Sequence, residues 1–273
     1  MTFDIQKYQK FALMQLKGRW KIAVSGTLVT MLLLVIFSFA KAKTPSVDYN
    51  TLISASTEEL LSMFQNSSST GAALLIDFLE TIIDFIVEIV LVTFFLIFSR
   101  SPDPVTMKNY FEGYNKWARG ILSGLWKLLW LFLWGLIAIP VLMVYAIIVV
   151  YLPVQPSETV SKILALIVIF IGFIPMFIKM LEYSFSFFFA SEFPEVGIRK
   201  ALRLSICIVK GHRADVFLLN LSFIGFFLLS MITLGIGFLW YIPYYYMTLT
   251  NAYHALLQDA LETGKIKPEE LNS

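Results

Sequence analysis

Four carboxylates stand in one strongly apolar stretch of the chain, at Asp77, Glu80, Asp84 and Glu88. Their spacings of three, four and four residues place them on one face of a helix, because residues three and four apart are neighbours on a helix surface. An ionised side chain is costly inside hydrocarbon, so such acids face a bundle interior or a water-filled cavity. This acidic stripe is the strongest candidate for a site that binds a cation, a proton or a basic peptide.

The depth of each acid follows from the end of the apolar stretch at Ser99 and Arg100. With a rise of about 1.5 Å per residue, Glu88 lies about 16 Å from the inner edge of a hydrocarbon core about 30 Å thick. Asp84 lies about 22 Å from that edge and Glu80 about 28 Å, and the first acid of the stripe falls just outside the core. Glu88 is thus expected near the membrane midplane.

Two interpretations of the acidic stripe stay open. In a functional one, the four acids line an outward-open vestibule that leads to Glu88 and binds a cationic ligand. In a structural one, Asp77, Glu80 and Asp84 belong to the solvated start of a long helix, and Glu88 is neutral or paired with a lysine. Lys127 is the candidate partner, since it lies about 10 Å deep on the next helix and its stem reaches further.

A second pair of charges, Lys179 and Glu182, stands near the inner end of a later apolar segment. Their three-residue spacing is that of an ion pair on a helix face. Long side chains that reach the membrane interface explain these two residues more simply than a binding site does.

Residues 195–210 have the pattern of a basic amphipathic helix, with Pro194 suited to its first turn and Gly211 to its end. One side holds Arg199, Arg203 and Lys210. Another side holds Leu202, Ile206 and Val209. A basic amphipathic helix between membrane spans most often lies on the anionic inner leaflet, and a docking platform for a cytoplasmic partner is the alternative. Residues 3–16 have a similar pattern.

Signatures of catalysis are absent from the sequence. It contains no H-E-x-x-H zinc motif, no P-loop and no G-x-S-x-G nucleophile elbow. The single cysteine, Cys207, can form neither an intramolecular disulfide nor a CxxC site. His212 and His254 stand apart from other ligand-type residues and are interpreted as polar residues at the membrane interface. The sequence therefore predicts a protein that is not an enzyme and uses no metal and no cofactor.

The elements that must position these residues are set by a very apolar composition. Of the 273 residues, 58% are hydrophobic and 15% charged, and the mean hydropathy is +0.76. A soluble domain carries about 25% charged residues, and a soluble surface this apolar would associate. The net charge of +2 gives no basic face for a nucleic acid. The composition predicts a polytopic membrane protein whose main partner is the lipid bilayer.

A helix needs about 20 mainly apolar residues to cross the hydrocarbon core. We expect residues 1–273 to form one all-α membrane domain with six transmembrane helices, arranged as three hairpins. These helices cover residues 22–40, 71–99, 121–152, 163–190, 216–234 and 238–257. An outer loop covers residues 41–70, and residues 233–237 form a tight turn. Pro140 kinks the third helix, while Pro175 and Pro243 interrupt the fourth and the sixth.

The orientation follows from the lysines and arginines of the loops. Sixteen of the 21 lie in segments on the same side as the N-terminus and three on the opposite side, and Lys127 and Lys179 lie within spans. Because positively charged loops stay on the cytoplasmic side, both termini are expected in the cytoplasm.

Several short motifs occur in a fixed order along the chain. They are Leu16-Lys17-Gly18-Arg19-Trp20, Leu221-Ser222-Phe223-Ile224-Gly225, Thr233-Leu234-Gly235-Ile236-Gly237 and Pro243-Tyr244. In these motifs the chain resembles the bacterial integral membrane proteins catalogued as domain of unknown function 975. The resemblance implies a six-helix protein of the bacterial cell membrane, and it supplies no activity and no catalytic residues.

The function is therefore inferred from the residues alone. We expect a role in transport, or as an accessory subunit that has another membrane protein as its partner. A protection or immunity protein that binds cationic peptides at the acidic stripe is the alternative. An enzyme that acts on lipid within the membrane is less favoured, because a nucleophile and metal ligands are missing.

Overall fold

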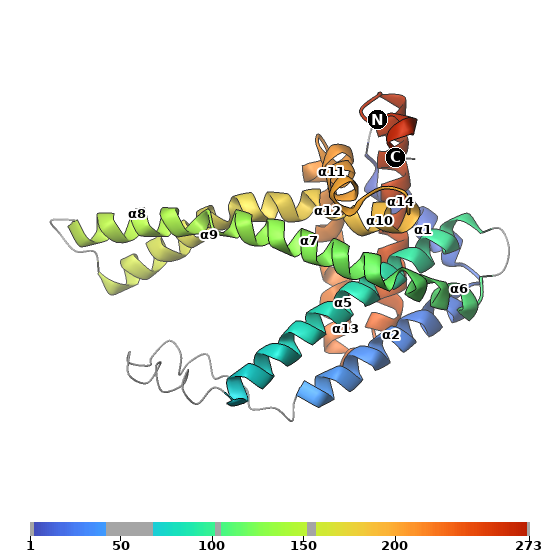
Figure 1. The fold of residues 1–273 in the computed structure, drawn as a ribbon, viewed down its shortest axis with the longest axis horizontal. Coiled ribbons are helices and arrows are strands. Elements are labelled where there is room, and N and C mark those ends of the chain that lie inside the picture. Colours follow the sequence, from blue (N-terminus) through green and yellow to red (C-terminus); the bar gives the residue numbers. More distant parts are fainter. Residues whose placement is uncertain (1–2, 42–67, 102–104, 152–156, 272–273) are drawn as a thin grey trace.

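The computed structural model describes residues 3–41, 68–101, 105–151 and 157–271, and every regular element in these ranges is helical (Figure 1). The all-α prediction is confirmed for this part of the chain. The predicted outer loop, residues 41–70, lies almost wholly outside the described residues. Of its residues, Lys41 ends the helix α2 (Trp20–Lys41), and residues 68–70 begin the helix α5 (Ser68–Arg100).

The helix α5 carries the acidic stripe and lies at the centre of the molecule (Figure 1). Its 33 residues correspond to about 50 Å, which exceeds the thickness of a hydrocarbon core. Its second half is the buried one, with Ile89, Phe94 and Phe98 fully enclosed. The half that carries Asp77 and Glu80 is only partly covered, and α2 lies along it.

Two glycines bring the helix α7 (Trp117–Gly135) directly onto α5. A Cβ atom at Gly120 would lie 2.6 Å from the Ile89 side chain, and one at Gly124 would lie 2.1 Å from the Phe85 ring. Small residues four apart allow the backbones of membrane helices to approach closely. The contact places Lys127, one turn after Gly124, beside the acidic stripe.

The third predicted span is two helices, not one. The helix α7 ends at Gly135, and α8 (Ala138–Tyr151) starts after a two-residue break. Pro140 explains the break, because proline has no N–H to donate to the Leu136 carbonyl and its ring clashes with that group. The helix α9 (Glu158–Glu182) then returns along α8, with Ala138 Cβ 3.2 Å from where a Cβ at Gly172 would lie, and the two form an arm that points away from the body (Figure 1).

The fourth and fifth predicted spans also differ from single helices. Residues 163–190 divide between α9 and the short helix α10 (Ser186–Glu192), with a turn at residues 183–185. Residues 216–234 divide at Phe223 between α12 (Arg213–Ser222) and α13 (Ile224–Ile232). Pro175 and Pro243 do not interrupt their helices: α9 and α14 (Phe238–Glu262) both continue through the proline.

The tight turn at residues 233–237 is confirmed. The Gly235 N–H donates to the Ser230 carbonyl at 3.0 Å, and the Gly237 N–H donates to the Thr233 hydroxyl at 2.9 Å. Leu234 and Gly235 adopt positive φ angles of 53° and 88°. The turn reverses the chain and sets α14 against α13.

Two amphipathic helices pack on the body of the protein. The helix α11 (Ile198–Val209) begins three residues later than predicted, because Pro194 lies in the turn before it. The helix α1 (Ile5–Leu16) is capped by the Asp4 carboxylate, which accepts from the Lys7 N–H at 3.0 Å, and its buried side lies on α14. The remaining described elements are α6 (Met107–Glu112) and the 3-10 helices η1 (Gly113–Lys116) and η2 (Pro268–Leu271).

The hydrophobic core lies where α5, α10, α11 and α14 meet. The helix α10 is its centre, since Phe187, Phe188 and Phe189 are at most 1% exposed. Tyr253 of α14 packs against two of these rings, with centroid distances of 5.0 and 5.3 Å. This rigid aromatic centre holds the helices that carry the candidate site.

Five segments in the described part of the chain are long and apolar enough to cross a membrane. They are Trp20–Phe37, Leu75–Arg100, Met107–Val149, Thr159–Glu192 and Arg213–Ile232. Apolar side chains on α8 and α9 are largely exposed, for example Phe170 at 74%. These features indicate a membrane protein. The sixth expected span, residues 238–257, is helical within α14 but is not among the five.

Candidate functional site

The four acids of the stripe lie along α5 as the spacing predicts. Asp84 is exposed, while Asp77, Glu80 and Glu88 are half-buried. Asp77 and Glu80 also interact with other groups of the protein. The four residues therefore present a continuous acidic face on a helix whose other faces are apolar.

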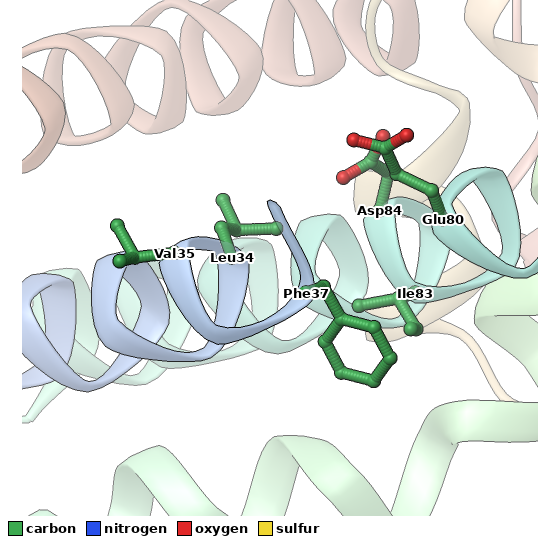
Figure 2. Close-up of a pocket in the computed structure, with 6 residues that line it drawn as sticks. All are labelled: Leu34, Val35, Phe37, Glu80, Ile83 and Asp84. Carbon is green, nitrogen blue, oxygen red and sulfur yellow. The ribbon is translucent and has the colours of Figure 1, made fainter. Parts of the chain in front are cut away.

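The middle of this face, at Glu80 and Asp84, borders a pocket between α2 and α5. The pocket encloses about 300 Å³ and is lined by Leu34, Val35 and Phe37 of α2 and by Glu80, Ile83 and Asp84 of α5. Figure 2 shows the carboxylates of Glu80 and Asp84 side by side, while Ile83 points away from them. Two adjacent carboxylates next to apolar side chains can bind a cationic group.

Glu88 lies at the other end of the stripe, and the structure brings it to Lys127. The Lys127 ammonium is 3.9 Å from the Glu88 carboxylate, and these side chains are 19% and 35% exposed. A charge-assisted hydrogen bond would be about 2.8 Å long, so the two groups face one another without bonding directly. Lys127 also lies 5.2 Å from the centre of the Phe187 ring, which holds the cation in the wall of the core.

Glu88 and Lys127 line a second cavity, of about 380 Å³, at the junction of α5, α7, α9, α12 and α14. Asn220 and Tyr245 add polar groups to it, and the Tyr245 hydroxyl donates to the Asn220 side-chain oxygen at 2.7 Å. Ser184 and Tyr246 also line it, and the other lining residues are apolar. We call this space the Glu88 cavity.

Lys179 and Glu182 form the expected helix-face pair, but their surroundings differ from an interface. Glu182 is fully buried, and it accepts from Lys179 at 2.7 Å and also from Arg213. The Glu182 backbone carbonyl accepts from Ser205 Oγ at 2.7 Å. The interpretation of two charged groups that only reach the membrane interface is thus wrong for Glu182. This carboxylate ties α9 to α11 and α12.

The basic residues of α11 are exposed, as a contact with the inner leaflet requires. Arg199, Arg203 and Lys210 all face outward, and the Arg199 guanidinium lies 4.8 Å from the centre of the Trp126 ring. The opposite side of α11 is buried in the protein and does not face lipid. Leu202 is 6% exposed and Val209 is fully buried, because the helix packs on α10, α7 and α14.

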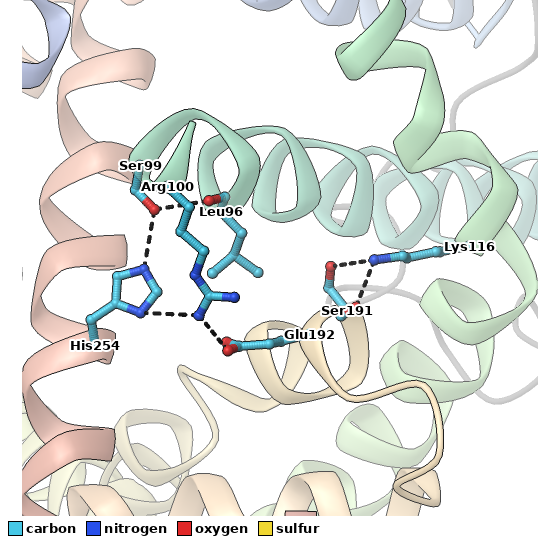
Figure 3. Close-up of polar contacts among 7 residues, drawn as sticks. All are labelled: Leu96, Ser99, Arg100, Lys116, Ser191, Glu192 and His254. Atoms are coloured by element: carbon cyan, nitrogen blue, oxygen red, sulfur yellow. Dashed lines mark hydrogen bonds and ion pairs between the residues drawn. The ribbon is translucent and has the colours of Figure 1, made fainter. Parts of the chain in front are cut away.

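A polar cluster joins the end of α5 to α10 and α14 (Figure 3). Arg100 pairs with Glu192, and its guanidinium also lies 3.5 Å from His254 Nδ1. The other ring nitrogen of His254 is 3.1 Å from Ser99 Oγ. Lys116 donates to the Ser191 carbonyl at 2.6 Å.

Arg119 makes the most extensive polar contact of α7. Its guanidinium donates to four backbone carbonyls in and after α10, at distances of 2.7 to 3.2 Å. Arginine supplies a fixed fork of donors that suits such a set of acceptors. Arg119 therefore fixes α7, and with it Lys127, relative to the buried helix α10.

The family described as "Protein of unknown function (DUF975)" matches residues 3–260 of the chain. The chain belongs to this family. The resemblance drawn from the short motifs is thereby confirmed. Searches of curated proteins and of solved structures give no match.

Four contacts of this DUF975 protein were not expected from its sequence. Arg213 reaches Glu182 across 31 positions, and Arg100 joins Glu192 and His254 at still larger separations. His212 is not isolated either, since its Nδ1 lies 3.0 Å from the Asp215 carboxylate. Only the last contact has a sequence signal, a three-residue spacing at the start of a helix.

Proposed function

We propose that this DUF975 protein is a non-enzymatic protein of the bacterial cell membrane that acts in transport, alone or as an accessory subunit of a membrane assembly. One observation carries the proposal: Glu88 and Lys127 line a cavity whose walls include α5, α7, α9 and α12, which lie in segments long and apolar enough to cross a membrane. Charged groups in such a position are costly and mark ion or substrate pathways. The other acids of the stripe continue from Glu88 toward the opposite end of α5.

The proposal includes six membrane crossings with both termini in the cytoplasm. The helix α14 has 25 residues, or about 37 Å, which is sufficient for a sixth crossing. Sixteen lysines and arginines then lie on the cytoplasmic side and three outside. The missing catalytic motifs support a role without catalysis.

Water access to position 88 from the outer side tests the proposal. In a background with Cys207→Ser, a cysteine is introduced by Glu88→Cys, and intact cells are treated with a water-soluble thiol reagent. We expect labelling at position 88, because a transport pathway must admit water or a polar solute to the cavity. In proteoliposomes, Glu88→Gln is expected to reduce the flux of the transported solute across the membrane. Glu262→Gln, on the exposed surface of α14, should leave this flux unchanged.

The matched control is Ile89→Cys in the same background. Ile89 is the next residue of α5 and is fully buried against α7, so it should stay unlabelled. Equal labelling of both positions would show only that α5 is loosely packed. If no aqueous reagent reaches the thiol of the Glu88→Cys variant from either side, and flux is unchanged in Glu88→Gln, a transport role is contradicted.

The pocket between α2 and α5 favours one alternative, a protection protein that binds cationic peptides. Its support is the pair of adjacent carboxylates, Glu80 and Asp84, at the border of that pocket (Figure 2). In that case deletion of the gene sensitises cells to a cationic peptide, and Glu80→Gln with Asp84→Asn reproduces the deletion. Glu88→Gln alone would then leave protection intact.

A further inference from the structure

The Glu88 cavity has one wall that is also outer surface. Phe177 and Met180 of α9 and Leu221 and Ile224 of α12–α13 line the cavity, yet each is 43–48% exposed. Side chains that face a cavity and the outside of the protein stand at an opening between the helices. The Glu88 cavity therefore opens sideways, between α9 and α12–α13, through an apolar rim.

The apolar rim lies on segments that indicate membrane contact. Both α9 and α12–α13 belong to the five segments that are long and apolar enough to cross a membrane. The Phe177 and Phe217 rings of these two segments meet edge to face, with centroids 5.8 Å apart. A molecule that enters here comes from the bilayer and carries its apolar part with it.

The polar wall of the cavity determines which head group fits. Glu88 and Lys127 together carry no net charge, so a ligand with a net charge would leave one charge uncompensated among mainly apolar side chains. A ligand with both an ammonium and an anionic group can pair with both residues. The 3.9 Å separation leaves each side chain able to form a shorter bond to such a ligand.

We propose that the Glu88 cavity binds the head group of a zwitterionic amphiphile from the bilayer, of the phosphoethanolamine lipid class. Its ammonium pairs with Glu88, its phosphate pairs with Lys127, and the Tyr245 and Asn220 pair lies within the same polar wall. Its acyl chains leave the cavity through the apolar rim. The cavity volume of about 380 Å³ falls within the usual range for ligand sites.

This inference rests on the proposed function and gives it a substrate class. The acidic stripe continues from Glu88 along α5 through Asp84 and Glu80. Carboxylates at successive turns can accept an ammonium group in sequence, while the acyl chains stay in lipid. Movement of the head group between the membrane midplane and the outer surface is the transport step that this arrangement supports.

Binding of a short-chain lipid to the purified full chain in detergent tests the inference. Titration calorimetry compares dihexanoylphosphatidylethanolamine with dihexanoylphosphatidylglycerol, which has the same chains and an anionic head. We expect the zwitterionic lipid to bind at least about tenfold more tightly, because its ammonium can form an ion pair with Glu88 that the anionic lipid cannot form. Equal affinity for the two lipids would overturn the proposal.

Two sets of variants test the contributions of the polar wall and of the apolar rim to binding separately. Glu88→Gln and Lys127→Met should each weaken binding by about tenfold, and Glu262→Gln should not. Leu221→Trp should block the cavity, whereas Leu218→Trp should not, because Leu218 is similarly exposed on α12 but does not line the cavity. Thermal unfolding and gel filtration identify variants that fail to fold, and the wild-type comparison of the two lipids then decides alone.

Other occupants give distinct results. O-phosphoethanolamine, the head group without chains, should bind much more weakly than the lipid, and equal binding would overturn the assignment to a lipid. If the chain is a dimer that Leu221→Trp dissociates, a second copy covers the rim and the proposal is wrong. If the lipid binds but position 88 is not labelled and no flux is measured, the transport role is contradicted and the lipid site is not.

Discussion

At the scale of single residues, the carboxylates inside the protein lie next to positively charged side chains. Glu88 and Lys127 lie at 3.9 Å on adjacent helices, and fully buried Glu182 is held by two cations. A buried carboxylate is strongly destabilising when it has no partner, but one of two partners can be lost at a smaller cost. Lys179 and Arg213 should therefore act non-additively on stability.

Removal of both cations around Glu182 tests this pairing. Lys179→Met and Arg213→Met should each lower the free energy of unfolding by about 1 kcal/mol, and the double variant by about 3–5 kcal/mol, because Glu182 is then buried and unpaired. Chemical denaturation of the purified protein measures the values. Adding Glu182→Gln to the double variant should restore most of the loss. Additive single effects, or no recovery with Glu182→Gln, would contradict a buried ion triad.

Only part of this pairing could be predicted from the sequence. The Glu88 and Lys127 contact follows from depth, because Lys127 lies on the next span about 10 Å deep and its stem reaches on toward the level of Glu88. The Arg213 contact does not, because it depends on how residues 183–212 fold between the end of α9 and the start of α12, two helices that lie in contact. The fold brings together charged residues that lie far apart in the sequence. The periodicity of apolar residues does not predict which of them will meet.

At the scale of elements, close helix contacts decide where the site forms. The glycines of α7 lie on Phe85, about one turn before Glu88, and on Ile89, the residue directly after it. Helix positions and most apolar faces follow from the sequence pattern. The break at residues 136–137 follows in part, because Pro140 predicts a kink there. The break at Phe223 does not follow, since hydropathy continues across it and only the local backbone changes.

A methyl group at Gly124 should separate α7 from α5. A Cβ atom there would lie 2.1 Å from the Phe85 ring, so Gly124→Ala forces one of the helices to move. We expect a loss of about 1–3 kcal/mol in the free energy of unfolding and a weaker Glu88 and Lys127 contact. Thermal unfolding in detergent, together with lipid binding, measures both effects.

Gly225→Ala is the matched control for this substitution. Gly225 lies in α13, and a Cβ atom there meets no atom within 4 Å. Because alanine favours helix more than glycine does, this variant should be as stable as the wild type or more stable by about 0.5–1 kcal/mol. A Gly124→Ala variant that behaves like Gly225→Ala would show that α7 and α5 are not tightly packed.

At the scale of the whole molecule, the orientation in the membrane determines which end of the acidic stripe faces outward. The chain has a single cysteine, Cys207 on α11, in a segment expected in the cytoplasm. Burial raises the pKa of its thiol above the usual value, and its Sγ lies 3.5 Å from the Lys265 carbonyl. Less thiolate is therefore present at neutral pH, and labelling must be done at alkaline pH.

The native cysteine thus reports the orientation without any substitution. A membrane-permeant maleimide should label Cys207 in intact cells, whereas an impermeant one should label it only after permeabilisation. Because the thiolate reacts, the rate should rise about tenfold per pH unit below the raised pKa. A matched probe is Ser157→Cys combined with Cys207→Ser, at the exposed start of α9 on the expected outer side. It should react with the impermeant reagent in intact cells and at lower pH. If the two positions exchange these behaviours, the stripe opens to the cytoplasm, and head groups bound at Glu88 would move along it to the inner leaflet instead.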